Sequence, residues 1–253
     1  MNMEKHMSRN KLSIEVGLKR AKATLSSDTV AIYQPPDGEY RSRKVVTRSR
    51  ARPTGKFPSW KMGRMVQWES VNELNAYRLL DADPNVLQYF EQPCLVRYRL
   101  NGEIRKHYPD CLVIRPGVKE LWEIKPNAEA TRPDVTERTT LLIRELPRLG
   151  FSYRLILGDD LAREPRLGNV LSILKYGRIP VSPITREHLR QSILQMGGLT
   201  WKDVDAGVVG PLSRQWICRL ILEGSLKVDL NVSWTKNTIL CWTSSMLINQ
   251  ART

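Results

Sequence analysis

Two short segments that join a carboxylate to a strand-like apolar run constrain this chain most strongly. Asp110 follows a proline and precedes the apolar residues 111–114, and twelve residues separate it from Glu123-Ile124-Lys125. A charge beside such a run is unfavourable unless it has a partner or a use. Residues two apart in a strand face the same way, so Glu123 and Lys125 should point together. We expect neighbouring strands to bring Asp110, Glu123 and Lys125 to one place.

A divalent metal ion is the simplest reason for such a cluster. Mg²⁺ takes oxygen ligands and keeps several waters, so two or three carboxylates suffice, and Mn²⁺ can substitute. We expect Asp110, Glu123 and the backbone carbonyl of Ile124 to be ligands. Lys125 would orient a water molecule or stabilise charge on a phosphate, as cutting a phosphodiester bond requires. His107 could contact phosphate or act as a base, but we expect a solvated strand residue.

A third carboxylate is expected from the helix that precedes these strands. Ser70 and Glu73 have the spacing of a capping box at a helix start. We expect Glu73 to be the helix ligand, with Glu69, one helical turn away, as the alternative. Two simpler interpretations remain: Glu73 only closes the capping box, and Glu123 with Lys125 forms a weak surface ion pair. The combination of all four charged groups in this order favours a metal-dependent nuclease site.

The order of predicted elements indicates a mixed α/β domain at residues 67–160. The predicted elements are a helix from Ser70 to about Asp81, strands at 92–100, 104–114 and 120–125, a helix at 133–149, and a strand at 151–157. Asn101-Gly102 predicts a hairpin between the first two strands. We therefore expect an α/β fold in which helices flank a mixed sheet.

Residues 161–253 have a different pattern. A bridging helix is expected at 169–174, helices at 184–196, 200–205 and 211–223, and strands at 226–230 and 238–242. Three helices followed by a two-stranded ribbon with a basic loop are typical of a winged helix-turn-helix. We predict a C-terminal winged-helix-like domain.

Positive charge is concentrated in residues 1–66. The net charge is +14, and residues 1–65 hold 15 Lys and Arg against 5 Asp and Glu. We predict a short basic helix at 14–25 and an extended arm at 34–66 that contacts DNA phosphates in a salt-dependent way. The predicted DNA-binding residues are Arg41, Arg43, Lys44, Arg48, Arg50 and Arg52.

Cysteine spacing and hydropathy exclude other classes of protein. The four cysteines form no Cys-x-x-Cys pair, which argues against a zinc site or a disulfide scaffold, and we expect them to be buried. No run approaches the roughly 20 apolar residues of a membrane span. We expect a soluble cytoplasmic protein.

The motifs also resemble a known superfamily. Ser70-x-x-Glu73, Tyr108-Pro109-Asp110 and Trp122-Glu123-Ile124-Lys125-Pro126 resemble the PD-(D/E)xK nucleases, and within them the TnsA-type endonucleases of heteromeric transposases. The resemblance is strongest from Trp68 to Leu157, and it implies a restriction-endonuclease-like core. Some relatives have Gln at the position of Glu123. Carried over, Glu73, Asp110 and Glu123 become metal ligands and Lys125 the catalytic lysine.

The resemblance also implies a function and partners. TnsA-type proteins use Mg²⁺ to cut the 5′ ends of a bacterial transposon, and a TnsB-type integrase-like transposase cuts and joins the 3′ ends. A TnsC-type AAA+ ATPase regulates both cutting reactions. Because the substrate is DNA, the protein would be nucleoid-associated when active. Two other hypotheses stay open: a restriction or repair endonuclease of the same superfamily, and a non-catalytic DNA-binding regulator. A neighbouring gene for an integrase-type transposase would favour the transposition hypothesis over a restriction or repair nuclease. Mg²⁺-dependent nicking would exclude the non-catalytic regulator.

Overall fold

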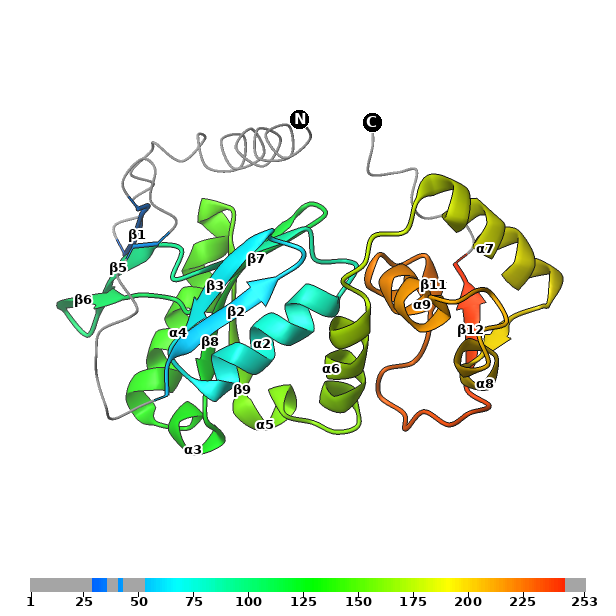
Figure 1. Cartoon of the computed structure of the whole chain (residues 1–253). Helices are drawn as coiled ribbons and strands as arrows, with labels where there is room; N and C mark the ends of the chain where they lie inside the picture. Colours follow the sequence, from blue (N-terminus) through cyan, green and yellow to red (C-terminus); the bar gives the residue numbers. More distant parts are fainter. Residues whose placement is uncertain (1–28, 36–40, 43–52, 244–253) are drawn as a thin grey trace.

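The computed structural model describes residues 29–35, 41–42 and 53–243, and these form a mixed α/β structure (Figure 1). The strands are β1 Val30–Tyr33, β2 Gly55–Ser59, β3 Arg64–Trp68, β4 Gln88–Glu91, β5 Leu95–Leu100, β6 Glu103–His107, β7 Cys111–Arg115, β8 Val118–Lys125, β9 Ser152–Leu157, β10 Leu199–Thr200, β11 Leu226–Lys227 and β12 Ile239–Trp242. The helices are α2 Val71–Ala82, α3 Asn127–Ala130, α4 Pro133–Glu145 with a 3₁₀ turn at Leu146–Leu149, α5 Gly158–Leu161, α6 Arg166–Tyr176, α7 Pro183–Gln195, α8 Trp201–Asp205 and α9 Ser213–Leu222.

A four-stranded sheet in the order β4-β7-β8-β9 forms the centre of the N-terminal part. β4, β7 and β8 are antiparallel neighbours, whereas β9 runs parallel to β8. A parallel pair needs a crossover connection, and α4 lies within the segment that joins β8 to β9. The sheet is therefore mixed, as the sequence predicts.

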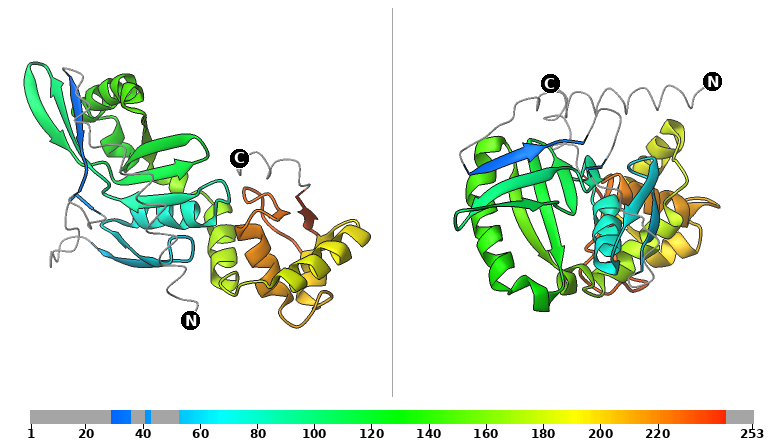
Figure 2. Two further views of the ribbon diagram at one scale, coloured as in Figure 1. Left: turned by 90° about the horizontal axis from the view of Figure 1, so that it is seen from above. Right: turned by 90° about the vertical axis from the view of Figure 1, so that its left-hand side faces the viewer.

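Alternating residues of β8 pack on the two faces of this sheet. Trp122 belongs to an apolar cluster that includes Tyr77 of α2, whereas Leu121 belongs to a second cluster that includes Leu142 of α4. The sheet thus lies between α2 and α4 (Figure 2). This arrangement sends every second residue of β8, including Glu123, toward the α4 side.

The predicted strand at 104–114 is wrong, because the chain forms two strands there. β6 pairs with β5 and ends at His107, whereas β7 begins at Cys111 and pairs with β4 and β8. Pro109 has no backbone N–H to donate to a ladder, so the break falls at residues 108–110. The hairpin at Asn101-Gly102 is confirmed, with φ of 53° and 84° at these two residues. The small sheet β1-β5-β6 packs beside α4.

Residues 53–66, the described end of the predicted arm, do not form a separate arm but pack into the fold. β2 and β3 form an antiparallel hairpin in which Phe57 and Val66 face each other and are buried in the core. The hairpin is attached to the end of α2: Asp81 accepts hydrogen bonds from the Ser59 hydroxyl and, at 3.2 Å, from the Trp60 amide. The hairpin was not predicted because each strand has only five residues, too few for a clear alternating pattern, and because Pro58 lies within β2.

The C-terminal part contains α7, α8 and α9 and a small sheet in the order β10-β12-β11. The three predicted helices are confirmed, β11 is shorter than predicted, and β10 was not predicted. Thr200 and Asp203 form a capping box at the start of α8. α6 contacts both α2 and α9, as expected of a bridge (Figure 1). One apolar cluster reaches from Phe57 in β2 to Leu240 in β12.

Two other expectations have clear outcomes. Cys94, Cys111 and Cys218 are buried as expected, but Cys241 is exposed because it lies on the outer side of β12. In the part of the chain that the structure describes, no helix has the length and apolarity to cross a lipid bilayer.

The pH dependence of folding should report on Lys61, in the turn of the β2–β3 hairpin. Its Nζ donates to the carbonyls of Asp83 and Val86, the latter at 2.7 Å. Burial lowers the pKa of Lys61 to about 8 from an ordinary 10.5, although Asp81 and Asp83 oppose the shift. Between these two pH values the unfolded chain binds a proton that the folded chain does not bind. Folding therefore becomes more favourable as the pH rises.

We expect the unfolding free energy of wild type, relative to Lys61→Met, to increase by about 1–3 kcal/mol from pH 7 to pH 10. Urea denaturation at several pH values measures this difference. Lys61→Arg stays protonated over this range and should show no such gain. A pH-independent difference between wild type and Lys61→Met would contradict the assignment.

Candidate active site

Asp110 is positioned by the antiparallel register of β7 and β8. Cys111 lies opposite Trp122, so the residue before β7 lies opposite Glu123. The Asp110 amide donates to the Trp122 carbonyl at 2.9 Å, and Asp110 Oδ2 accepts from the Ile124 amide at 2.7 Å. The carboxylate is thus held beside the C-terminal end of β8, next to Glu123 as expected.

Glu123 and Lys125 lie on one side of β8, as the strand period predicts. Lys125 Nζ lies 3.0 Å from Glu123 Oε1, with side-chain exposures of 27% and 3%. Trp122 and Ile124, which alternate with them, are both buried in apolar clusters. The pair is therefore not the exposed ion pair of the simpler interpretation.

Glu73 lies in the first turn of α2. Its backbone amide donates to Ser70 Oγ at 3.1 Å, so Ser70 caps the helix as predicted. Its Oε1 accepts from Ser70 Oγ, and its Oε2 accepts from the Glu69 amide at 2.9 Å. Glu73 therefore has a structural role at the helix start, and its side chain also lines the cavity described next.

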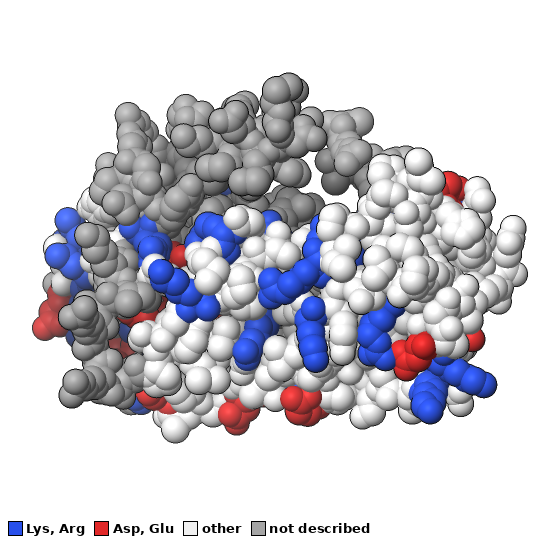
Figure 3. All heavy atoms as spheres, in the orientation of Figure 1, with Lys and Arg blue, Asp and Glu red and all other residues white. Residues whose placement is uncertain are grey.

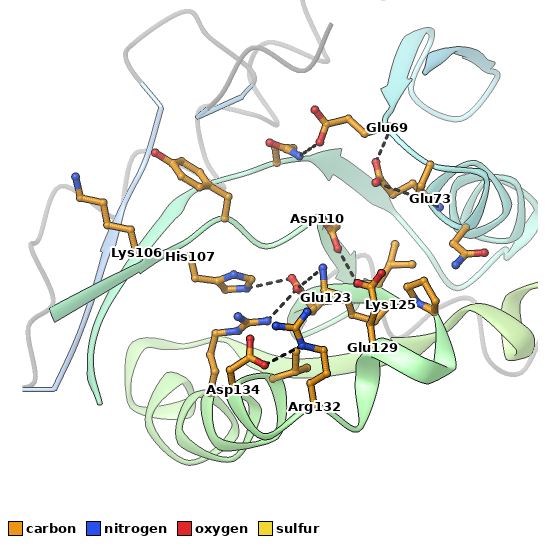
Figure 4. Close-up of a pocket in the computed structure, with 18 of the residues that line it drawn as sticks. Glu69, Glu73, Lys106, His107, Asp110, Glu123, Lys125, Glu129, Arg132 and Asp134 are labelled. Carbon is orange, nitrogen blue, oxygen red and sulfur yellow. Dashed lines mark hydrogen bonds and ion pairs between the residues drawn. The ribbon is translucent and has the colours of Figure 1, made fainter. Parts of the chain in front are cut away.

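A cavity of about 880 Å³ brings the predicted site residues together. Figure 4 shows Glu69, Glu73, Asp110, Glu123 and Lys125 around it. The residues that line the cavity are Thr54, Glu69, Ser70, Asn72, Glu73, Gln92, Lys106, His107, Tyr108, Asp110, Glu123, Ile124, Lys125, Pro126, Glu129, Arg132, Asp134, Val135 and Arg138. Glu69 and Glu73 thus both face the same space, and Glu69 Oε2 accepts a hydrogen bond from Gln92 at 3.2 Å.

His107 is not the solvated strand residue that we expected. It is buried at the end of β6, where its Nε2 lies 3.2 Å from Glu123 Oε2. The Tyr153 hydroxyl of β9 lies 3.0 Å from the same nitrogen. The end of β6 turns toward the central sheet here, a tertiary contact that the sequence does not indicate. His107 therefore belongs to the surroundings of Glu123.

Arg138 of α4 is a site residue that the sequence interpretation missed. Its Nη2 lies 3.1 Å from Glu123 Oε1, and its side chain is 14% exposed. The residue lies at helical spacing between the buried Val135 and Leu142. An arginine on the apolar side of a helix signals a buried partner, so this position could have been found from the sequence.

The electrostatics of the site are asymmetric. Burial raises the pKa of Asp110 well above its ordinary value, and repulsion from Glu123 and Glu73 adds to the shift. Burial alone would also raise the pKa of Glu123, but His107, Lys125 and Arg138 together lower it. Burial opposes the charge on Lys125, yet Glu123 and Asp110 raise its pKa overall. Glu123 is therefore held ionised by its cationic neighbours, whereas Asp110 is crowded by like charge.

The oxygen donors fit a hard divalent cation in chemistry, although their arrangement would have to adjust. No three carboxylate, imidazole or thiol groups among the described residues are placed so that they could hold a metal ion together. Glu123 Oε1 already contacts Lys125 and Arg138, Glu123 Oε2 lies beside His107 Nε2, and both oxygens of Glu73 accept hydrogen bonds. The mutual repulsion of Asp110, Glu123 and Glu73 is what a divalent cation would relieve.

Only one of the predicted DNA-binding residues can be placed. Arg41 donates to Gln67 Oε1, and its Nε lies 3.9 Å from Glu91 Oε1, so its guanidinium faces β3 and β4. The others, Arg43, Lys44, Arg48, Arg50 and Arg52, lie outside the described residues, as does the predicted helix at 14–25.

A comparison of the chain with models of protein families and with curated proteins finds no match.

The network around Glu123 makes a prediction about stability. In Arg138→Met the buried carboxylate keeps Lys125 and His107 but loses its contact with α4. We expect a loss of about 1–3 kcal/mol in unfolding free energy, because the desolvated charge is less compensated. Urea denaturation at pH 7 measures the loss.

Arg163→Met is the matched control. Its side chain, 65% exposed, pairs with an exposed Asp160. Exposed pairs contribute little, so this variant should lose much less stability. Equal losses in the two variants would show that Arg138 does not compensate Glu123.

Proposed function

We propose that this protein is a Mg²⁺-dependent DNA endonuclease with a restriction-endonuclease-like core. The observation that carries the proposal is the cavity where Asp110, Glu123 and Lys125 meet Glu73. Asp110 precedes β7, Glu123 and Lys125 lie at the end of β8, and Glu73 lies in the first turn of α2. Carboxylates with an adjacent lysine can serve phosphodiester hydrolysis, which needs an activated water and compensation of developing charge.

Each residue has a proposed role. Asp110, Glu123, Glu73 and the Ile124 carbonyl would hold Mg²⁺, which when bound supplies charge stabilisation and a more acidic water. Mn²⁺ prefers similar ligands and should substitute. Lys125, held protonated beside Glu123, would orient the water or stabilise the phosphate.

Two neighbours of Glu123 would position it. Arg138 and His107 contact its two different oxygens, which limits rotation of the carboxylate. If Glu123 turns toward a cation, Arg138 loses a contact and its positive charge becomes available to a DNA phosphate. On this proposal Arg138 pairs with Glu123 before the cation binds and with a DNA phosphate afterwards, which explains an arginine in a cation site.

We further propose a TnsA-type role in transposition. The motif resemblance supports it, and so does the C-terminal order of helix, short strand, two helices and two strands, which fits a winged helix. On this proposal the protein cuts the 5′ ends of a transposon in double-stranded DNA in a bacterial cytoplasm. A TnsB-type transposase would act on the 3′ ends, and a TnsC-type AAA+ ATPase would regulate both.

A nicking assay with Mg²⁺, end-sequence DNA and the transposase partner tests the catalytic assignment. We expect Asp110→Asn and Lys125→Ala to lose cutting by at least about 100-fold while keeping DNA affinity, because both lose transition-state stabilisation. Glu103→Gln changes an exposed carboxylate on β6 and should cut like wild type. Cutting by Asp110→Asn at the wild-type rate would exclude the site.

Metal binding gives a second readout that does not depend on turnover. Ca²⁺ or Mn²⁺ should raise the melting temperature of wild type, because a ligand of the folded state stabilises it. Asp110→Asn should show little of this increase. An equal increase in both proteins would place the cation elsewhere.

The isolated protein should cut poorly and without sequence preference. No segment of the sequence is typical of base-specific recognition, so we expect the transposase partner to choose the ends. Cleavage of end-sequence and scrambled duplexes, with and without the partner, measures this. Efficient site-specific cutting by this chain alone would refute the expectation.

A further inference from the structure

Cationic and aromatic side chains meet where the β2–β3 hairpin, α6 and α9 come together. Arg219 of α9 lies 4.4 Å from the ring of Trp60, and Arg178 Nη1 lies 3.4 Å from the Pro58 carbonyl. Lys175 and Arg214 each lie 5.2 Å from the ring of Tyr176. The basic seam is defined as Lys175, Arg178, Arg214, Arg219 and Lys236.

Much of the positive charge in the basic seam is not neutralised. Lys175, Arg178 and Lys236 are exposed and form no ion pair with any carboxylate in the described ranges. Two other members have acidic partners: Arg214 pairs with Asp205, and Arg219 pairs with Glu223 at 2.6 Å. Figure 3 shows a band of Lys and Arg across this face, with few Asp or Glu inside it. The band therefore presents net positive charge to solvent.

A hollow beside the basic seam adds apolar surface to the charge. A cavity of about 240 Å³ is lined by Trp201, Trp234, Arg214 and Lys236 among others. The two indole rings lie 5.1 Å apart, and Trp201 Nε1 is buried with no hydrogen-bond partner in the part of the chain described. Trp201 is buried, so the cations beside it rather than its ring face solvent. Exposed Lys and Arg suit a nucleic-acid backbone, because phosphate and sugar take most of the hydrogen bonds between proteins and DNA.

The arrangement favours duplex DNA over an acidic protein segment. The cations lie on α6 and just after it, on α9 and on the loop before β12, and Figure 3 shows Lys and Arg spread over this face rather than gathered in one groove. The elements share one apolar cluster, so the band is preorganised along a fixed direction. A duplex presents phosphates at regular spacing along a line, which matches such a band.

We infer that the basic seam binds the backbone of the DNA duplex that flanks the cut strand. The inference rests on the proposed function, since it takes DNA as the substrate. It assigns the C-terminal part a role as a DNA-holding surface, in addition to the N-terminal arm. The contacts are to the backbone, so they add affinity without base preference.

Charge reversal tests the basic seam. Lys175→Glu/Arg178→Glu is compared with Arg163→Glu/Arg190→Glu, which makes the same charge change at exposed residues of other elements. Fluorescence anisotropy with a duplex of about 30 base pairs, in Ca²⁺ at several salt concentrations, gives the affinity and its salt slope. We expect the seam variant to bind at least about 10-fold more weakly than the control, with a salt slope lower by about 2. Thermal unfolding confirms that both variants are folded.

Separate outcomes distinguish this inference from the proposed function. If the seam variant and the control bind with the same affinity and slope, the inference is overturned, whatever the nicking assay shows. If wild type does not nick but the seam variant still loses affinity, the seam stands and the catalytic proposal fails. If the seam variant keeps DNA affinity but loses binding to the purified AAA+ partner, the surface is a protein-docking site and the inference is wrong. Lys236→Glu, on a separate loop, should weaken DNA binding in the same direction.

Discussion

The buried charge of Glu123 is the constraint on which the candidate site depends. An ionised carboxylate in the protein interior is costly unless it is paired. Here Lys125, Arg138 and His107 surround it from β8, α4 and β6. These three elements can meet only when β6 turns toward the central sheet and α4 packs on it. The charge balance of the site therefore depends on the same packing that forms the fold.

The same arrangement explains why carboxylates and cations occur together in the cavity. Asp110 is repelled by Glu123 and Glu73, while Glu123 is compensated by its cationic neighbours. A divalent cation would relieve the repulsion at Asp110, and it would compete with Lys125 and Arg138 for Glu123. The proposed nuclease function would need this combination, because such a site must hold a cation and a phosphate close to each other.

Packing also links the two parts of the molecule. α6 contacts α2 and α9, and Arg219 of α9 packs on Trp60 of the β2–β3 hairpin. A flexible linker would leave the C-terminal part free to reorient, whereas a shared apolar cluster gives it a set direction.

The sequence by itself determined the local features of this protein. Strand period placed Glu123 with Lys125 on one side of β8, and short-range chemistry predicted the Ser70 cap and the Asn101-Gly102 turn. Each of these depends on residues close together in the chain, which is why a pattern could reveal them. Tertiary structure decided the rest: the break at Pro109, the β2–β3 hairpin, and the approach of His107 and Arg138 to Glu123. Those contacts join residues from separate elements, so they exist only once the elements pack and a buried charge must find partners.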